Sequence, residues 1–281
     1  MQKCDTGACL SLKTGGNRVK DVLVCGAGGG MGSAAVSLLA KNGYRVFALD
    51  LNEISPSENV VPIKVDVTSE EGVRSAYDAV REYTDTLYGV IHFAGIYMLD
   101  SLVEMEPSDF KRIFDVNLYG VYLINRVFMP LFKKGSRMLI TTSELAVLDP
   151  LPFTGIYAVS KAALDKYAYS LRMELQLLGV SVSVLRAGAV DTGMLGVSTA
   201  ALDRFCDKTE LYACNSRRFK DIVDRVEARC VSTERLAKKA MKIIGKKKPS
   251  FAYSINRNPL LRLLNFLPKR LQLWIIKKIL A

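Results

Sequence analysis

Short apolar runs alternate along the chain with longer segments whose hydrophobic residues recur every three or four positions. Six runs have the length and composition of buried strands: Asp21–Cys25, Tyr44–Asp50, 60–65, 87–92, 137–142 and 180–186. Four periodic segments predict helices: 33–43, 70–84, 107–133 and 157–178. This regular alternation predicts an α/β protein built on a doubly wound parallel sheet.

A glycine-rich loop joins the first predicted strand to the first predicted helix. It reads Gly26-Ala-Gly-Gly-Gly-Met-Gly32, and the second strand ends in Asp50. Glycines let a backbone turn tightly and approach a pyrophosphate, while a helix N-terminus offers it free amides. An acid after the second strand is placed to accept a hydrogen bond from a ribose hydroxyl. Glycines are also ordinary turn residues, but this order of elements predicts a dinucleotide site.

Tyr157 and Lys161 share one face of a predicted helix, because they are four residues apart. A phenol is a poor acid or base at neutral pH, and a neighbouring ammonium would lower its pKa by favouring the phenolate. Such a pair can also be an ordinary helix surface. The strands ending in Ala94-Gly95 and in Ser143 bring further small and polar residues into the same order.

These motifs together resemble the short-chain dehydrogenase/reductase family over about residues 19–192. The resemblance implies a Rossmann-like fold and a catalytic tetrad of Asn117, Ser143, Tyr157 and Lys161. It also implies a set of cofactor-binding residues: Gly26, Gly30, Met31, Gly32, Asp50, Asp66, Val67, Ala94, Gly95, Tyr157, Lys161, Gly188, Val190 and Thr192.

The family resemblance implies a role for each member of the tetrad. Ser143 would hold the substrate oxygen, Tyr157 would exchange a proton with it, and Lys161 would lower the tyrosine pKa and hold the nicotinamide ribose. Asn117 would hold a water that links Lys161 to solvent, or would simply pack at a dimer interface. The reaction implied is the reversible conversion of an alcohol to a ketone.

Three residues depart from the family pattern. Cys25 stands in place of a threonine, Phe93 in place of an asparagine and Ala187 in place of a proline. The first two changes remove side-chain hydrogen bonds that would tie the cofactor loop to a neighbouring strand. None of the three removes a group that handles protons, so the expected activity stands.

The residues around Asp50 favour NAD(H) over NADP(H). Its carboxylate would repel a 2′-phosphate, and neither the loop Ala27-Gly28-Gly29 nor Leu51-Asn52 provides a Lys or Arg to receive one. The single histidine, His92, ends a buried strand and lacks the arrangement of a Ser-His-Asp hydrolase. The six cysteines show no metal-ligand spacing, so no metal is expected and a cytoplasmic location is simplest.

Hydrophobic residues surrounding the tetrad predict an apolar pocket. Segment 193–230 carries no family motif, and in this family such a segment forms a lid over the substrate. Candidate substrate residues are Leu145, Phe153, Met194 and Leu195, although these side chains could equally pack the lid itself. A lipophilic alcohol such as a hydroxysteroid is the expected substrate, with a retinoid or another small alcohol as the alternative. The hydroxysteroid and retinol dehydrogenase branch has a similar overall pattern.

The chain divides into a flexible leader at 1–18, a single catalytic domain at 19–245 and a tail at 246–281. Residues 235–281 contain 13 Lys and Arg and no Asp or Glu, and this excess accounts for the net charge of +11. The tail is apolar, cationic and helical on both sides of Pro268, and its apolar runs are too short to span a bilayer. It could lie on a membrane surface, or cover the substrate mouth or a partner subunit; its aliphatic character disfavours nucleic acid.

Two functions from different classes fit these features. The first is an NAD-dependent dehydrogenase, expected to assemble as a homo-oligomer of two or four chains. The second is a dinucleotide-binding regulatory protein that has lost turnover. The complete set of Asn117, Ser143, Tyr157 and Lys161 favours the enzyme.

Overall fold

The structure is a computed structural model that describes residues 19–191, 194–225 and 230–281. The leader expected at 1–18 and the candidate cofactor residue Thr192 lie outside this description. The backbone of 194–199 is described as helix, but its side chains are not, so nothing follows about the side chains of Met194 and Leu195.

Seven parallel strands form one sheet in the order β3-β2-β1-β4-β5-β6-β9. The order reverses direction at β1, which confirms the doubly wound arrangement predicted from the sequence. A second, two-stranded sheet joins β7 to β8. The strands are β1 Lys20–Cys25, β2 Tyr44–Asp50, β3 Val60–Lys64, β4 Leu87–His92, β5 Phe132–Ser143, β6 Ser181–Ala187, β7 Val190–Asp191, β8 Val231–Ser232 and β9 Ala252–Ile255.

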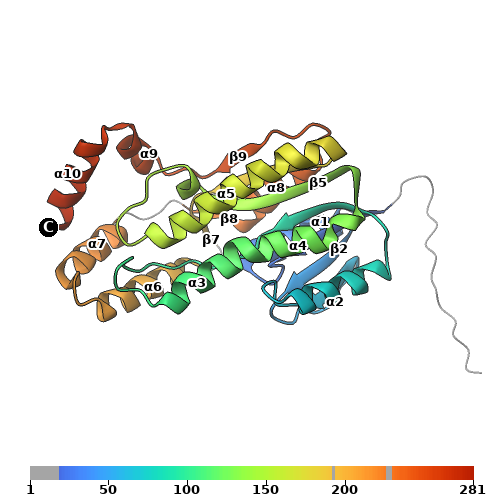
Figure 1. The fold of residues 1–281 in the computed structure, drawn as a ribbon, viewed down its shortest axis with the longest axis horizontal. Coiled ribbons are helices and arrows are strands. Elements are labelled where there is room, and N and C mark those ends of the chain that lie inside the picture. The colour runs from blue at the N-terminus through green and yellow to red at the C-terminus, as the bar shows by residue number, and fades with distance from the viewer. Residues whose placement is uncertain (1–18, 192–193, 226–229) are drawn as a thin grey trace, which may run out of the picture.

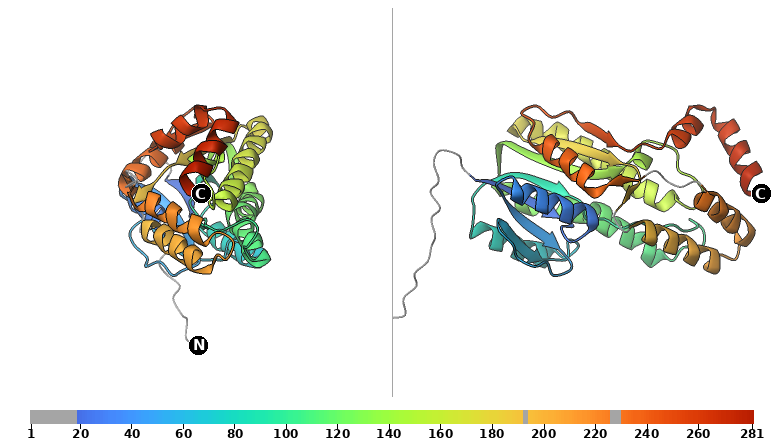
Figure 2. Two further views of the ribbon diagram at one scale, coloured as in Figure 1. Left: turned by 90° about the vertical axis from the view of Figure 1, so that its left-hand side faces the viewer. Right: turned by 180° about the vertical axis from the view of Figure 1, so that it is seen from behind.

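Helices cover both faces of the large sheet, and four more gather at one end of the molecule (Figure 1). The first group comprises α1 Gly30–Lys41, α2 Glu70–Arg81, α3 Pro107–Phe114, α4 Gly120–Phe128, α5 Gly155–Leu175 and α8 Thr233–Ile244. The second group comprises α6 Met194–Lys208, α7 Ala213–Arg225, α9 Pro259–Phe266 and α10 Lys269–Leu280. Figure 2 shows the sheet between its two helical layers and the four end helices beyond it.

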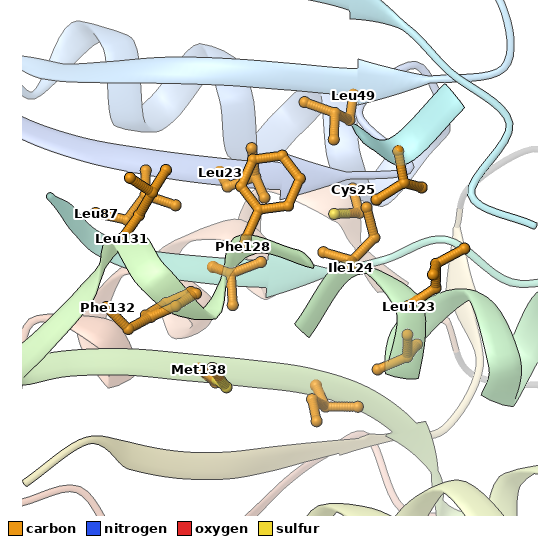
Figure 3. Packing of buried hydrophobic residues seen from close by; sticks show 14 of the residues in the cluster. Leu23, Cys25, Leu49, Leu87, Leu123, Ile124, Phe128, Leu131, Phe132 and Met138 are labelled. Carbon is orange, nitrogen blue, oxygen red and sulfur yellow. The ribbon is translucent and has the colours of Figure 1, made fainter. Parts of the chain in front are cut away.

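Each face of the sheet has its own hydrophobic core. On one face, α2, α4 and α5 bury their apolar residues against alternate positions of the strands. There Phe128 and Ile124 of α4 point at Leu23 and Cys25 of β1 (Figure 3). On the other face, α1 and α8 pack together over residues such as Val24. Because both faces are covered, the central strands are apolar throughout, as the sequence pattern predicted.

The single helix predicted over 107–133 is interrupted. A π-helical turn at Asp115–Tyr119 separates α3 from α4, and α4 ends at Phe128 before a 3₁₀ turn that contains Pro130. The π-helical turn carries Asn117, whose buried amide bonds to a neighbouring loop in place of facing solvent. Proline cannot continue a helix, so the chain enters β5 at Phe132, five residues earlier than predicted.

The strand β9 was not predicted, because residues 246–281 were interpreted as a helical tail. Ala252–Ile255 pairs with Val184–Ala187 of β6 and becomes the edge of the main sheet. The sheet therefore extends beyond residue 245, where the sequence analysis placed the end of the catalytic domain. The tail after β9 is helical as predicted, in two helices that turn at Pro268.

The expected helical lid is formed by α6 and α7. Its apolar residues pack with Leu99, Leu151 and Phe153 from the main domain and with Leu280 from the last helix. Leu202 and Phe205 of α6 are buried there, whereas Leu211 faces solvent. Within the described residues, no helix combines the length and apolarity needed to cross a bilayer.

The first turn of α1 leaves no room for a side chain at Gly32. A Cβ there would overlap the carbonyl oxygen of Gly26 and lie 2.8 Å from Ala27 Cα, whereas a Cβ at Gly29 would make an ordinary 3.6 Å contact. We therefore expect Gly32→Ala to lower the free energy of unfolding by about 2 kcal/mol or more, despite the gain of up to ~1 kcal/mol in helix propensity.

Gly29→Ala is the matched control, and it should stay within about 0.5 kcal/mol of the parent protein. Urea denaturation of both variants provides the measurement. Equal stability of the two variants would show that α1 can move away from the loop at little cost.

Candidate active site

Four adjacent strands bring the site residues to one edge of the sheet. Cys25 pairs with Leu49 of β2 and His92 of β4, and His92 pairs with Ile140 of β5. The residues that follow these strands therefore meet at their common carboxyl edge, the position of ligand sites in open parallel sheets. They are the glycine loop, Asp50, the Ala94-Gly95 loop and Ser143.

The glycine loop is shaped to hold a phosphate. Gly26 has φ of +76°, and a Cβ there would lie 2.7 Å from Ala94 Cα. The helix α1 has Gly29 as its N-cap, with no side chain capping it and no acid in its first turn. Its first amides therefore remain available to an anion, and the helix dipole favours negative charge at this position. These residues fit the pyrophosphate of a dinucleotide.

Asp50 is fixed beside this loop by two backbone amides. Its Oδ2 accepts from Gly28 N at 2.8 Å, and its Oδ1 accepts from Asn52 N at 2.9 Å. An ionised carboxylate with two donors is held in one orientation at the end of β2. A ribose hydroxyl could donate to it, whereas a phosphate would meet its negative charge.

A cavity of about 540 Å³ extends from this loop toward α3 and the π-helical turn that follows it. Asp66 also faces it, with its carboxylate oriented by Thr68 N and Oγ1 at 2.8 and 2.7 Å. Nine of the predicted cofactor residues line this cavity: Gly26, Gly30, Met31, Gly32, Asp50, Asp66, Val67, Ala94 and Gly95. The structure thus brings residues from 26 to 95 around one space of dinucleotide scale.

Asn117 connects this cavity to the helix that carries the tyrosine. It is fully buried, with Oδ1 accepting from Ile96 N at 2.8 Å. Its Nδ2 donates to Ile96 O and to Ser160 Oγ, both at 3.0 Å, and Ser160 Oγ donates to the Tyr157 carbonyl at 2.8 Å. Asn117 therefore fixes the loop after Gly95 to the start of α5 within this chain.

Ser143, Tyr157 and Lys161 lie together beside Gly95. The hydroxyls of Ser143 and Tyr157 share a hydrogen bond. Lys161 Nζ lies 5.7 Å from the centroid of the Tyr157 ring and donates to the Thr141 carbonyl at 3.5 Å. A Cβ at Gly95 would be 3.2 Å from Lys161 Nζ and 3.0 Å from Asn117 Oδ1, so only glycine leaves this space open.

Burial shifts the two titrating groups in opposite directions. It raises the pKa of Tyr157 to about 12, against a lowering by the hydrogen bond from Ser143 and a small further rise from Tyr97. Burial also lowers the pKa of Lys161 to about 8. Lys161 was expected to lower the pKa of the tyrosine, but here desolvation of the phenolate is the largest cause and raises that pKa, and the lowering comes from Ser143. At neutral pH the pair therefore holds both protons.

A second cavity, of about 830 Å³, lies between the glycine loop and the lid. Tyr97 lines it and stacks edge-on against Tyr157, with ring centroids 4.9 Å apart. Its apolar wall consists of Met98, Leu99, Met105, Ala201 and Phe205, and its charged rim consists of Asp100, Asp109, Arg112, Arg204 and Lys208. The space is amphipathic, and not uniformly apolar as the sequence suggested.

The candidate substrate residues Leu145 and Phe153 do not line this cavity. Phe153 has φ of +67°, and its ring packs against Phe205, Tyr212 and Phe219 at centroid distances of 4.6, 5.4 and 5.6 Å. It therefore packs the lid, which was the alternative considered for this residue. Leu145 follows Ser143 in a short 3₁₀ turn and is half-buried.

Gly188 and Val190 lie on the far side of Ser143. A Cβ at Gly188 would overlap the Asn256 carbonyl, and Gly188 N donates to Ile255 O at 2.9 Å. Val190 pairs with Val231 in the small sheet. Gly188 is thus adjacent to the tail strand β9 and Val190 to β8, and the lid segment follows after them.

Cys25 and Phe93 depart from the family pattern and cannot make its side-chain hydrogen bonds, but backbone hydrogen bonds join the same two segments. Phe93 N and Ala94 N both donate to the Cys25 carbonyl, at 2.8 and 3.0 Å. Cys25 and Phe93 are buried in the two cores. His92 Nε2 pairs with Asn125 Oδ1 at 2.9 Å, and burial lowers its pKa to about 4, so the histidine is a neutral packed residue.

Sequence reasoning missed three residues of this region. Tyr97 lies two residues beyond the Ala94-Gly95 motif, a position that could have been flagged because it follows a strand end. Glu144 follows Ser143 directly, and its buried carboxylate accepts from Asn258 N at 2.8 Å. Arg112 faces both cavities, and nothing in its helical sequence context distinguishes it from a surface charge.

Comparison with known proteins agrees with this geometry. The family model for short chain dehydrogenases matches residues 20–203. The chain belongs to this family. Its members are oxidoreductases that use a nicotinamide dinucleotide.

Individual relatives of the family show what this chain is similar to. Estradiol 17-beta-dehydrogenase 2 of Mus musculus is 32% identical over 189 residues, which is 63% of this chain and 50% of that protein. An NADPH-dependent 1-acyldihydroxyacetone phosphate reductase of Schizosaccharomyces pombe is 31% identical over 65% of each chain. The chain thus spans between half and two thirds of these relatives. A solved short-chain dehydrogenase from Francisella tularensis superposes with a TM-score of 0.71 at 19% identity, covering 85% of this chain and 97% of the other.

The bonds of Asn117 lead to a testable difference in stability. Asn117→Ala leaves the amide and carbonyl of half-buried Ile96 without their partner, so we expect a loss of about 2–3 kcal/mol in the free energy of unfolding. Ser160→Ala removes the bond from Asn117 Nδ2 and the local bond to the Tyr157 carbonyl, but it leaves Asn117 joined to Ile96, so its expected cost is about 1–1.5 kcal/mol. Urea denaturation of both variants provides the measurement. A Ser160 variant as unstable as the Asn117 variant would show that the bonds from Asn117 to Ile96 contribute little to stability.

Proposed function

We propose that this chain is an NAD(H)-dependent dehydrogenase that interconverts a secondary alcohol and a ketone on a lipophilic substrate such as a hydroxysteroid. The observation that carries this proposal is the Ser143–Tyr157 hydroxyl pair, with Lys161 near the tyrosine ring. Lys161 and Asn117 both lie against Gly95, which lines the dinucleotide-sized cavity. Membership of an oxidoreductase family supports it.

A bound nicotinamide dinucleotide would supply or accept the hydride. In reduction, the Tyr157 hydroxyl gives its proton to the carbonyl oxygen, while the Ser143 hydroxyl holds that oxygen in place. The tyrosine suits this role because its pKa of about 12 keeps it protonated at neutral pH. Lys161, still largely cationic at neutral pH, stabilises the phenolate that remains. In oxidation the proton moves in the reverse direction, from the alcohol to the phenolate.

Asp50 supports NAD(H) as the preferred cofactor. The fixed carboxylate at the end of β2 suits a ribose hydroxyl and opposes a 2′-phosphate. Among the described residues that line the 540 Å³ cavity beside Asp50, Arg112 is the one Lys or Arg. Arg112 also lines the 830 Å³ cavity, which shares Gly29 and Gly30 with the first. It therefore faces the pyrophosphate position more than the adenosine ribose. The yeast relative is named for NADPH, so the choice needs a direct test.

The second cavity supports a lipophilic substrate. Its methionine, leucine and phenylalanine wall provides apolar contact, and the name of the mouse relative points to a hydroxysteroid. A retinoid or another small alcohol fits the same wall. A panel of hydroxysteroids, retinol and short alcohols, followed by NADH absorbance, tests the class. Cofactor binding without turnover on any of them would favour the regulatory alternative.

Exposed side chains on the outer helices support a homo-oligomer. Large apolar residues of the π-turn, α4 and α5 face solvent in the single chain: Tyr119, Tyr122, Val159, Tyr169 and Met173. We infer that they pair with a second copy in a dimer or tetramer, which sedimentation can test. The free cysteines in the described part of the chain support a cytoplasmic location.

Removing the Tyr157 hydroxyl should abolish most turnover without loss of fold. Tyr157→Phe deletes the proton donor, so we expect kcat to fall by about 10² or more, while NADH binding stays near wild type. Tyr97→Phe is the matched control: it keeps the ring contact with Tyr157 and should retain most activity. A Tyr157 variant with more than about a tenth of wild-type kcat would contradict the assignment of Tyr157 as the proton donor.

Asp50→Ala should change the cofactor preference. It removes a hydroxyl acceptor and a repulsive charge, so kcat/KM should fall with NAD and rise with NADP. Asn52→Ala keeps the carboxylate and serves as control, with the preference unchanged. The ratio of kcat/KM for the two cofactors is the measurement, and a wild-type enzyme that already prefers NADP would contradict the charge argument.

A further inference from the structure

The outer face of α9 and α10 exposes large hydrophobic side chains. Phe266 is 80% exposed and Trp274 58%, and these two helices expose five further residues of this kind: Leu260, Leu263, Leu271, Leu273 and Ile279. Isolated surface hydrophobic residues are common, but seven of them within the 24 residues 258–281 mark an interaction surface. We call these seven residues the tail face.

The tail face is held in place by the opposite sides of the same helices. The Leu280 carbonyl accepts from Asn215 Nδ2 at 2.7 Å and from Arg218 at 3.4 Å, and the Leu280 side chain is buried in the lid cluster. Asn258 caps α9 and is bonded through its own amide to Glu144. The exposed residues therefore belong to docked helices, and not to a loose extension.

In the tail helices α9 and α10, some leucines are buried and others are exposed. The sequence pattern suggested one face formed by Leu260, Leu261, Leu264, Leu267, Leu271, Trp274, Ile275 and Ile279. The turn at Pro268 splits this set, so that Leu261 packs inward while Leu260, Leu271, Trp274 and Ile279 point to solvent. Docking onto the protein uses one side of each helix. The exposed hydrophobic residues of α10 lie around the rest of its circumference, without a partner among the described residues.

Charge indicates what covers the tail face. Residues 258–281 carry Arg262, Lys269, Arg270, Lys277 and Lys278 and no acid. One of these cations, Lys269, is paired with Asp149 of the main domain, which leaves the segment strongly positive. A second copy in a symmetric contact would present the same cations to this face and be repelled. Aliphatic side chains between lysines also give nucleic acid no stacking platform.

We propose that the tail face binds an anionic lipid membrane surface. Leucine, phenylalanine and tryptophan side chains enter the boundary between headgroups and acyl chains, and the flanking cations contact anionic headgroups. The helices lie in the plane of the membrane and do not cross it.

The tail face also lies directly behind the lid of the substrate cavity. The inner side of α10 packs on α7, and the lid cluster that buries Leu280 includes Leu99 and Phe205, which line that cavity. Figure 1 shows α10 beside α7 at the lid end of the molecule. A lipophilic alcohol dissolved in the bilayer would thus enter close to where it is bound; this consequence rests on the proposed function, whereas membrane binding does not.

The single tryptophan makes the test direct, because Trp274 lies on the tail face and reports only on it. The full chain is mixed with vesicles of phosphatidylcholine alone or with about 30% phosphatidylserine, which gives the surface the negative potential of an anionic leaflet. We expect flotation with the anionic vesicles, a blue shift of tryptophan emission, and loss of both with rising salt. Binding to neutral vesicles should be at least about tenfold weaker.

A triple variant, Leu263→Ser, Phe266→Ser and Leu273→Ser, keeps the tryptophan and replaces only exposed side chains. We expect its partition coefficient to fall at least about tenfold, with an unchanged thermal melting curve. Leu177→Ser is the control, because Leu177 is 83% exposed but lies in the 3₁₀ turn Gln176–Leu178 after α5, outside the tail helices. It should bind vesicles like the parent chain.

Three results would overturn the proposal. The first is no flotation and no spectral shift with anionic vesicles, and the second is binding that survives the triple variant. The third is a triple variant that converts an oligomer to a monomer while the parent ignores vesicles, which would make the tail face a subunit contact. Turnover measured in detergent without vesicles tests the proposed function separately, so either idea can fail alone.

Discussion

The contact between the first turn of α1 and the loop after β1 constrains the whole site. Gly32 brings the helix against the Gly26 carbonyl, closer than any side chain would allow. That approach aims the uncapped amides of α1 at the edge of the sheet. The same loop receives the carboxylate of Asp50 through Gly28 N, which fixes β2 relative to the helix. Every feature of the candidate cofactor cavity is positioned relative to this contact.

Asn117 extends this constraint to the groups that handle protons. Its amide holds the loop after Gly95 on one side and the start of α5 on the other, so the cavity and the Ser143–Tyr157 pair move together. The π-helical turn is the cost of this arrangement, because it breaks the regular hydrogen bonding of the helix that would otherwise run through residue 117. Burial in this region then decides the protonation states of Tyr157 and Lys161.

The tail is part of the framework of the candidate site as well as an outer surface. Strand β9 completes the sheet beside β6, and the turn after it reaches Gly188 and Glu144, next to Ser143. Farther on, α10 supports the lid through Leu280. A cationic segment that appears appended in the sequence therefore determines how the substrate side of the site is built, while its outer face is free to meet another surface.

The amino-acid sequence by itself determined the order of strands and helices, the glycine loop, Asp50 and the tetrad positions, because local periodicity and short-range motifs encode them. It could not place β9, since four residues, Ala252–Ile255, acquire strand character only by pairing with β6, 65 or more residues away in the chain. The π-helical turn was also missed; there Asn117 accepts a hydrogen bond from Ile96 N and donates one to Ile96 O. The inward packing of Phe153, the placement of Tyr97 against Tyr157 and the direction of the Tyr157 pKa depend likewise on desolvation and contacts between distant segments. Such effects exist only when the chain is folded, so the tertiary structure alone decided them.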